Sequence, residues 1–308
     1  MNEGLIVVSP CDGMSCGQLA LKRAGIKVDK YYASEIKKTG IDTTMKHFPN
    51  TIQLGDMTNI KYINGLLYTE NGIFNIGKVD LLIGGTPCQD FSILKDINHE
   101  TRGLNGDKSK LFYEYLRLLK EIKPKYFLLE NVRMKKDSEK ELNIHLGVEG
   151  IHINSELVSF ASRPRIYWTN IPGITQPKDK NINFQDYKDT DFDYCKQFKV
   201  NKTPSRIRMW NDGKGRETIG NCNNITNAKK IGCITRKQDR FPNAGLIEFD
   251  GFCRYLTRRE IELAQNLPLG YTEHLSYGQM QDLCGDGWTI DVIAHIFSFL
   301  EVEKDEEE

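Results

Sequence analysis

A cysteine in a turn rich in glycine and proline is the first residue of this sequence that could do chemistry. Cys88 lies in the segment GGTPCQDFS, residues 84–92, directly after the apolar run at 79–83. A turn at a strand end exposes and orients a thiol, whereas structural cysteines are buried and inert. Taken alone, a Pro-Cys pair would still favour an ordinary core cysteine. The assignment therefore depends on the groups that accompany Cys88.

Charged side chains follow in comparable positions. Glu130 ends the apolar run at 125–129, and the segment RPRIYW contributes Arg163 and Arg165. A thiol, a carboxyl group and a guanidinium can act as nucleophile, proton donor and electrostatic stabiliser. This combination favours a catalytic site over core packing.

The first turn of the chain has features of a nucleotide-binding turn. Its sequence, CDGMSCG at 11–17, has glycines where a backbone must pass close to a ligand. Glu35 follows Gly13 by 22 residues, the usual distance for an acid that binds a ribose hydroxyl. Asp56, after the next strand, could accept a hydrogen bond from an adenine amino group. Each of these two acids could instead cap the N-terminus of a helix.

The elements that must position these residues alternate along the first half of the chain. Helices are predicted near 17–24 and at 111–122, and apolar runs predict five strands, at 5–9, 30–34, 51–54, 79–83 and 125–129. This alternation predicts an α/β fold with a doubly wound, mostly parallel, Rossmann-like sheet. Ligands of such sheets bind beyond the carboxyl ends of the strands. Those ends carry Asp12, Glu35, Asp56, Cys88 and Glu130.

The chain changes character after residue 172, where Asn, Lys, Gly and Asp become frequent. Helical periodicity returns at 257–266 and 290–300. We therefore expect three parts: a catalytic domain at 1–172, a small irregular domain at 173–252, and a segment at 253–308 that returns to the first domain and ends in an acidic tail at 301–308.

Charge and cysteine content restrict the function further. The net charge is zero, but the segment 196–259 holds fifteen Lys and Arg against five acids, which indicates a polyanion-binding face or a solvated surface. The eight cysteines form no CxxC pair, so we expect neither a metal site nor a disulfide framework. No signal peptide and no apolar run of about 18 residues is present, which predicts a cytoplasmic protein without a membrane partner.

At this point the order of the motifs resembles the DNA (cytosine-5)-methyltransferase family over almost the whole chain. The sequence is most similar to the catalytic domain of the eukaryotic de novo enzymes, without their chromatin-reading modules, which implies a stand-alone bacterial or phage-type enzyme. The motifs that carry the resemblance are ASE, GGTPCQDFS, LFYEYLRLL, ENV, RPRIYWTNIPG and LCGDGWTIDVIAHIF.

The resemblance implies a class I methyltransferase fold and methyl transfer from S-adenosyl-L-methionine to carbon 5 of cytosine, which leaves S-adenosyl-L-homocysteine. The Cys88 thiolate would add to carbon 6, because carbon 5 is a poor nucleophile until something does so. Glu130 would hold and protonate N3, and Arg165 would contact the ring oxygen. Arg163 is implied as a further catalytic residue.

The resemblance also implies a set of cofactor-binding residues. They are Asp12, Gly13, Met14, Glu35, Ile36, Asp56, Met57, Pro87 and Trp288. Two positions depart from the family pattern: Cys11 stands where the family has phenylalanine, and Asp286-Gly287 stands where it has Asn-Ser or Arg-Ser. Both departures bear on cofactor affinity.

The implied partner is double-stranded DNA, from which the target cytosine must be flipped out. The segment from Ser92 to Lys110 is polar and glycine-marked, as expected of a loop that closes over DNA, and the basic small domain would contact phosphates and bases. The candidate DNA-binding residues are Gln89, Ser92, Arg206, Arg208, Arg236, Lys237 and Arg240. A partner restriction nuclease cannot be inferred from this sequence.

Two other functions stay open. One branch of this fold methylates transfer RNA and carries a late Cys-Phe-Thr signature, of which Cys233-Ile-Thr235 is a faint echo. A catalytically silent DNA-binding regulator is the second alternative, and the presence of Cys88, Glu130 and Arg165 together argues against it. Thymidylate-synthase-like enzymes share the Pro-Cys attack on a pyrimidine but not the cofactor-binding sheet.

Overall fold

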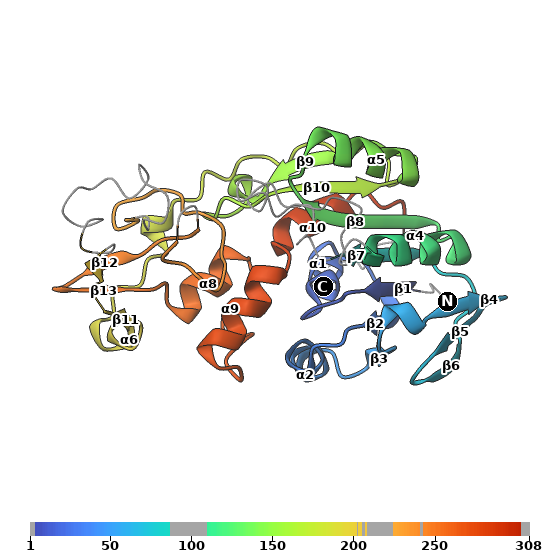
Figure 1. Ribbon diagram of the computed structural model, residues 1–308, viewed down its shortest axis with the longest axis horizontal. Helices are drawn as coiled ribbons and strands as arrows, with labels where there is room; N and C mark the ends of the chain where they lie inside the picture. Colours follow the sequence, from blue (N-terminus) through green and yellow to red (C-terminus); the bar gives the residue numbers. More distant parts are fainter. Residues whose placement is uncertain are drawn as a thin grey trace. The chain divides into compact units, whose positions relative to one another are not determined.

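The structure is a computed structural model that describes residues 4–86, 110–201, 203–204, 207, 224–240 and 243–302. The chain divides into two compact units (Figure 1), each described by itself. The first unit comprises Met1–Ile153, Pro164–Gln176 and Ile293–Glu308, and the second comprises Asn154–Arg163 and Pro177–Val292.

The first unit is built on a sheet that has seven strands in the described part of the chain, in the order β3-β2-β1-β7-β8-β10-β9. Neighbours from β3 to β8 pair in parallel, and β10 runs antiparallel to β8. The strands are β1 (Leu5–Pro10), β2 (Val28–Ser34), β3 (Ile52–Gln53), β7 (Leu81–Gly85), β8 (Tyr126–Val132), β9 (Ile151–Asn154) and β10 (Pro164–Thr169). The prediction of a doubly wound, mostly parallel α/β fold is confirmed.

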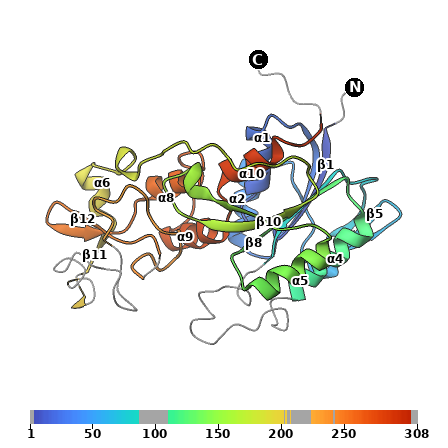
Figure 2. The ribbon, with the colours of Figure 1, turned by 90° about the horizontal axis from the view of Figure 1, so that it is seen from above.

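Helices cover both faces of this sheet, so its strands are apolar on both sides. Figure 2 shows α1 and α10 on one side of the strands and α4 and α5 on the other. The helices of the first unit are α1 (Cys16–Arg23), α2 (Lys38–His47), α4 (Lys110–Ile122), α5 (Lys136–Leu146) and α10 (Ile290–Phe297), of which α10 enters the unit at Ile293. Consistent with burial from both faces, Val7 and Val8 of β1 are both fully buried.

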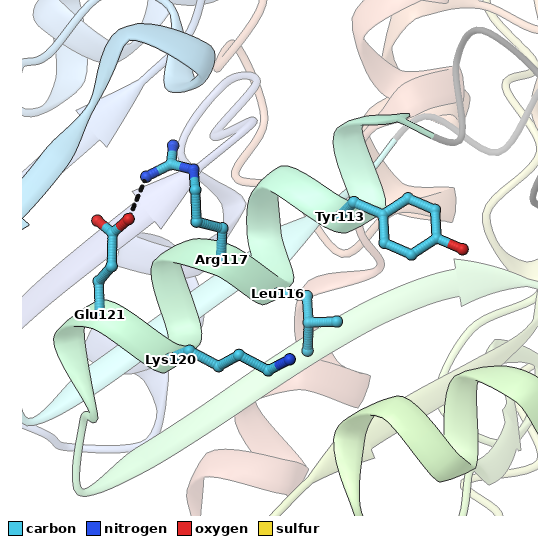
Figure 3. A pocket seen from close by; sticks show the side chains of 5 residues that line it. All are labelled: Tyr113, Leu116, Arg117, Lys120 and Glu121. Atoms are coloured by element: carbon cyan, nitrogen blue, oxygen red, sulfur yellow. Dashed lines mark hydrogen bonds and ion pairs between the residues drawn. The ribbon is translucent and has the colours of Figure 1, made fainter.

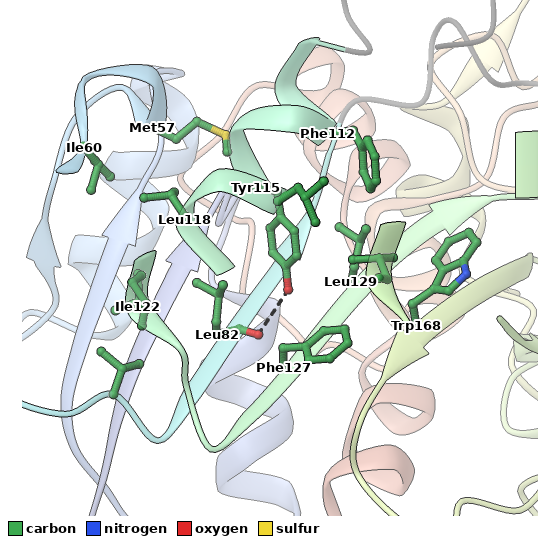
Figure 4. Close-up of a cluster of buried hydrophobic side chains, with 14 of the residues drawn as sticks. Met57, Ile60, Leu82, Phe112, Tyr115, Leu118, Ile122, Phe127, Leu129 and Trp168 are labelled. Carbon is green, nitrogen blue, oxygen red and sulfur yellow. Dashed lines mark hydrogen bonds between the residues drawn. The ribbon is translucent and has the colours of Figure 1, made fainter. Parts of the chain in front are cut away.

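The α4 helix supplies most of the helical side chains in the main core. Its apolar residues fall on one face, and Phe112, Tyr115 and Leu118 are fully buried against β7, β8 and β10 (Figure 4). The Tyr115 hydroxyl donates to the Leu128 carbonyl oxygen at 3.1 Å. This bond fixes α4 against β8, a strand that leads to the candidate site.

An antiparallel meander follows β3 and was not predicted from the sequence. It consists of β4 (Lys61–Ile63), β5 (Leu66–Thr69) and β6 (Gly72–Asn75), with β5 in the middle. A short 3-10 helix, η1 (Met57–Asn59), connects β3 to the meander. Residues 54, 57, 60 and 67 are buried in the same core as α4.

The second unit is held by short elements and by polar contacts. Its elements are η3 (Ser155–Leu157), η4 (Phe184–Asp186), α6 (Phe192–Lys196), β11 (Lys199–Val200), β12 (Ile247–Phe249), β13 (Phe252–Arg254), α8 (Arg258–Ala264) and α9 (Tyr277–Asp286). Capping boxes begin α8 at Thr257 and α9 at Ser276. Arg254 and Glu260 form a two-pronged ion pair, at 2.8 and 2.9 Å, with neither side chain exposed.

The compact units do not coincide with the three parts expected from the sequence. Residues 253–292, which we grouped with the returning segment, belong to the second unit, and the chain re-enters the first unit only at Ile293. The expected catalytic domain at 1–172 is likewise interrupted, because 154–163 packs in the second unit. Packing units need not be functional domains, so the functional boundaries stay a prediction.

Candidate active site

The turn after β1 is held by a network around Asp12. The carboxylate accepts hydrogen bonds from the hydroxyls of Ser9 at 2.7 Å, Tyr31 at 2.6 Å, and Ser15. Burial raises the pKa of the Asp12 carboxyl, while these hydrogen bonds act in the opposite direction. The Asp12 N–H donates to the Ser34 carbonyl oxygen at 3.1 Å. Asp12 thus ties β1, β2 and the start of α1 together, which makes it a positioning residue of the turn.

Glu35, at the carboxyl end of β2, fastens this turn from the other side. Its Oε2 accepts from the Gly13 N–H at 2.8 Å, and its Oε1 accepts from the Ile36 and Lys37 N–H groups at 2.8 Å each. The alternative role as a helix cap does not apply, since Lys37 is the N-cap of α2 and makes no side-chain cap bond. The Glu35 carboxylate therefore has a fixed orientation at the end of its strand.

Asp56 is the N-cap of η1, which is the alternative left open by the sequence. Its Oδ1 accepts from the Thr58 N–H at 2.9 Å. A carboxylate offers about four acceptor positions, so this bond is compatible with a further hydrogen bond to a ligand amino group. The cap also fixes the direction of the side chain.

Cys11 lies close to Asp12, Glu35 and Asp56, so these three acids lie near one another. Its Sγ is 3.4 Å from Met57 Sδ. Burial, with the nearby carboxylates of Glu35 and Asp56, raises the pKa of the Cys11 thiol to about 12. The thiol is therefore protonated and unreactive at neutral pH. The φ angle of Cys11 is 58°, a left-handed conformation that bends the chain at the end of β1.

The remaining predicted cofactor residues of the first unit divide into buried and exposed side chains. Met14 and Met57 are 1% and 3% exposed, so their side chains serve the core. Ile36, next to Glu35, is 72% exposed, so a large apolar side chain is accessible beside that acid. Gly13 has φ 63°, and among the described residues no atom lies within 4 Å of the point where a Cβ would stand.

These observations fit S-adenosylmethionine. Open space over Gly13 admits a ligand close to the backbone, and Ile36 offers an apolar surface for a planar ring. The fixed carboxylates of Glu35 and Asp56 are acceptors suited to ribose hydroxyls and to an adenine amino group. Gly40 of α2 allows this cradle to form, because a Cβ there would stand 2.5 Å from the Gly13 carbonyl oxygen.

Glu130 and Arg165 form a buried ion pair between neighbouring strands. Arg165 Nε lies 2.9 Å from Glu130 Oε1, with side chains 12% and 9% exposed. Glu130 was expected just beyond a strand, but it lies inside β8, where it pairs with Gly85 of β7 on one side and Tyr167 of β10 on the other. The strand continues because β10 offers it a second partner. The structure therefore brings together two residues that the sequence indicated separately as site residues.

The Gly85 register places Glu130 beside the strand that leads to the cysteine turn. Cys88 lies outside the described residues, as do Pro87, Gln89, Ser92, Arg206 and Arg208. The described part of this segment ends at Thr86, whose carbonyl and hydroxyl oxygens accept from Asn131 Nδ2 at 3.4 and 3.3 Å. The sequence analysis did not predict this role of Asn131. Its position directly after Glu130 in the ENV motif is the feature of the sequence that could have indicated it.

Arg163 and Trp288 belong to the second unit. The Arg163 guanidinium donates to the carbonyl oxygens of Gly285 at 2.9 Å and Gly287 at 2.8 Å, and to Cys233 Sγ at 3.3 Å. Arg163 is 5% exposed and Trp288 is 8% exposed. Arg163 therefore holds the segment before Trp288 in shape, and the catalytic role expected for it stays a prediction, as does cofactor binding by Trp288.

Three predicted DNA-contact residues lie on one anchored turn of the second unit. Arg236, Lys237 and Arg240 are exposed, whereas Gln238 between them is fully buried. Gln238 Nε2 donates to the Tyr277 hydroxyl at 2.9 Å, and its Oε1 accepts from the Leu256 N–H at 3.0 Å. The buried glutamine holds the turn and leaves the cations at the surface.

A hollow along α4 contains none of the predicted site residues. Tyr113, Leu116, Arg117, Lys120 and Glu121 line it (Figure 3). The Glu121 carboxylate accepts from Arg117 Nη1 at 2.8 Å and from the Tyr62 N–H at 3.0 Å, so it helps to join α4 to the meander.

In the described part of the chain, no group of three His, Cys, Asp or Glu side chains is arranged to hold a metal ion. No helix there combines the length and apolar character needed to cross a membrane.

Comparison with known proteins shows which family these residues resemble. Residues 6–150, which include the Asp12 turn, Glu35, Asp56 and Glu130, match the family model of the C-5 cytosine-specific DNA methylases. The first half of the chain is therefore similar to a C-5 cytosine-specific DNA methylase domain. The resemblance indicated by the sequence motifs is thereby confirmed, and the family and fold imply S-adenosylmethionine as methyl donor.

Relatives that match parts of the chain include proteins of bacteria, phages and a plant. The type II methyltransferase M.FnuDI of Fusobacterium nucleatum is 37% identical over 115 residues, which are 37% of this chain and 28% of that protein. The orphan methyltransferase M.SPRI of Bacillus phage SPR is 27% identical over 201 residues, 61% of this chain and 42% of that protein. The chain thus spans less than half the length of each relative.

The fold of the methylase domain recurs in solved structures. The structure of the Entamoeba histolytica methyltransferase EhMeth superposes with a TM-score of 0.69 at 16% identity, covering 97% of this chain and 98% of that one. At this identity the likeness shows the fold, which is that of the class I methyltransferases.

Proposed function

We propose that the chain is an S-adenosylmethionine-dependent DNA (cytosine-5)-methyltransferase that acts on a cytosine flipped out of double-stranded DNA. The observation that carries the proposal is the buried Glu130–Arg165 pair, which lies beside the strand that leads into the GGTPCQDFS segment. Chemistry at carbon 5 of cytosine requires a nucleophile, a proton donor and a cation in one place, and these segments supply all three.

Cys88 is the proposed nucleophile. Its thiolate sulfur forms a bond to carbon 6 of the cytosine, and the electron pair of the 5,6 double bond moves to carbon 5. Glu130 donates a proton to N3 as charge develops on the ring, and Arg165 orients the Glu130 carboxyl and contacts the ring oxygen. S-adenosylmethionine, when bound, supplies the electrophilic methyl group for carbon 5. A base then removes the carbon 5 proton, the N3 proton returns to Glu130, the 5,6 double bond reforms and the carbon 6–sulfur bond breaks, which returns the thiolate.

Cofactor binding is proposed for the cradle at the carboxyl ends of β1, β2 and β3. Glu35 accepts from the ribose hydroxyls, Asp56 accepts from the adenine amino group, and Ile36 packs on the ring. The fixed geometry of both carboxylates supports this assignment, because a preorganised acceptor loses little freedom when the ligand binds. Asp12 acts by holding the turn.

DNA binding is proposed for the exposed cations of the second unit. Arg236, Lys237 and Arg240 project from a turn that Gln238 anchors, so they can meet phosphates without loss of the turn. The acceptor could also be RNA, and a silent regulator would bind DNA without methyl transfer. Both are outcomes of the test below.

The test is methyl transfer by the purified protein from tritiated S-adenosylmethionine to duplex DNA and, separately, to transfer RNA. We expect label in DNA, loss of transfer in Cys88→Ala, and retention in Cys195→Ser, a matched change at a buried cysteine of α6. Bisulfite sequencing of the labelled DNA gives the methylated position. Label in RNA alone, no label with the wild-type protein, or full activity of Cys88→Ala would each contradict the proposal.

A further inference from the structure

The turn between β5 and β6 places a carboxylate on the backbone of Asp56. Glu70 Oε1 accepts from the Asp56 N–H at 2.9 Å, and Glu70 Oε2 accepts from Asn59 Nδ2 at 3.1 Å. One side chain therefore bridges both ends of η1, the short helix that Asp56 caps. Glu70 is 14 residues from Asp56 in sequence and belongs to the meander, which neither the sequence analysis nor the proposed function uses.

Gly55 makes this contact possible. Its φ is 80°, and a Cβ at this position would stand 1.9 Å from Glu70 Oε1 and 2.5 Å from Glu70 Cγ. Every residue other than glycine would expel the Glu70 side chain from its place over the turn. The carbonyl oxygen of Gly55 accepts from the Ser34 hydroxyl at 2.6 Å, so the same glycine also joins the turn to the end of β2.

We propose that Glu70 is a positioning residue for the cofactor's adenine, acting through Asp56. Without Glu70, the Asp56 N–H and the Asn59 side chain lose their shared acceptor, and η1 keeps its backbone bonds and its cap bond but not the bridge to the meander, so the Asp56 carboxylate samples more orientations. Its neighbours Cys11 and Glu35 stay in place, because the Asp12 network and the Glu35 contacts do not involve the meander. The expected consequence is weaker recognition of the adenine amino group, with the ribose contact unchanged.

This inference rests on the proposed cofactor site, and binding of S-adenosylhomocysteine by calorimetry tests both without the need for turnover. For Glu70→Ala we expect a Kd raised about 3- to 10-fold, the usual effect of removing one or two hydrogen bonds. Glu70→Gln keeps an acceptor for the Asp56 N–H and should stay within about threefold of wild type. Asn71→Ala is the matched control, since Asn71 lies in the same turn but donates to the Gln53 carbonyl oxygen of β3 at 3.1 Å.

A second ligand separates positioning from a general loss of structure. S-inosylhomocysteine carries an oxygen in place of the adenine amino group and cannot donate to Asp56. We expect wild type to prefer S-adenosylhomocysteine, and Glu70→Ala to lose most of that preference while binding the inosine analogue as wild type does. An equal weakening of both ligands, an equal effect of Asn71→Ala, or an unchanged Glu70→Ala would overturn the positioning role. A wild-type protein that binds neither ligand would instead reject the proposed cofactor site, and this inference with it.

Discussion

Glu130 and Asp12 are both carboxylates of the first unit, yet their surroundings differ in kind. Asp12 is surrounded by three hydroxyl donors and is occupied entirely by holding a turn. Glu130 forms an ion pair with Arg165 from an adjacent strand. A carboxylate held by three neutral donors gives up part of its network when it exchanges a proton, whereas an ion pair holds a carboxylate by charge. The contrast agrees with the proposed roles, in which Asp12 holds the turn and Glu130 transfers a proton.

Replacement of Glu130 by Gln therefore tests chemistry more than folding. The amide keeps the size of the side chain and can still bond to Arg165, but it cannot give a proton to N3. We expect single-turnover methyl transfer to slow by roughly 10²–10⁴-fold, the usual contribution of general acid catalysis. Duplex DNA affinity should change little, since phosphate contacts dominate it.

Glu114→Gln is the matched control for this variant. Glu114 pairs with Arg117 at 2.8 Å on α4, where both side chains are 31% exposed. Exposed pairs of this kind contribute little to stability, so the control should retain the wild-type rate. A reduction under threefold in Glu130→Gln would remove Glu130 from the mechanism.

Strand β7 shows how an element prepares a site that lies beyond it. Gly84 packs so closely under α4 that a Cβ would stand 2.9 Å from the Tyr115 ring and 3.1 Å from the Pro10 carbonyl oxygen. Tyr115 is fully buried and its hydroxyl is bonded to β8, so the ring cannot move aside cheaply. The first glycine of the GGTPC segment is thus required by packing between a strand and a helix.

We expect Gly84→Ala to destabilise the protein by about 1–3 kcal/mol, the usual cost of overpacking a core. The strain arises shortly before Thr86 and its bond from Asn131, so methyl transfer should fall even where the protein remains folded. Urea unfolding followed by fluorescence measures the first effect, and tritium transfer measures the second. Gly278→Ala on α9 is the control, because no described atom lies within 4 Å of its Cβ position. Unaltered stability in Gly84→Ala would contradict the packing argument.

The strands of the sheet were predictable because burial on both faces requires continuous apolar runs, as in Leu5–Pro10. The meander was harder to predict, since its strands have three or four residues and carry mixed polarity. Its signal was Asn64-Gly65, where φ is 49° and 84°, as a tight hairpin turn requires. The sequence motifs indicated both Glu130 and Arg165 as site residues, and the structure places their side chains 2.9 Å apart. It could not reveal that Glu70 reaches Asp56, because such a contact depends on how a hairpin folds back over a turn.

At the scale of the whole molecule, zero net charge conceals an uneven distribution. The basic segment 196–259 lies in the second unit, and not all of its cations face water. Lys230 donates to the carbonyl oxygens of Glu156 and Ser159, and burial lowers its pKa. Arg254 is fully buried with Glu260. These two cations stabilise the unit, so only the exposed cations of the segment are candidates for the proposed contacts with a polyanion.

The salt dependence of DNA affinity measures how many exposed cations bind phosphates. A substitution that removes one cation from a phosphate should make the slope of log K against log salt shallower by about 0.9. We expect Lys237→Gln to do so, and Lys120→Gln, an exposed lysine of α4, to leave the slope unchanged. Fluorescence anisotropy of a labelled duplex across a salt series gives the slopes. Equal slopes for wild type and Lys237→Gln would mean that this turn does not touch DNA.

The discontinuous first unit has a consequence for how the chain is made. On a ribosome the strands of the sheet emerge early, but α10, which covers one face from Ile293 onward, emerges only after all of 177–292. The second unit can therefore become compact while the sheet still lacks a helix. Until residues 293–297 arrive, the apolar strand face on the side of α1 stays partly uncovered, and such surface is prone to aggregation or capture by chaperones. A late stall in translation would therefore leave the chain with part of its apolar sheet face exposed.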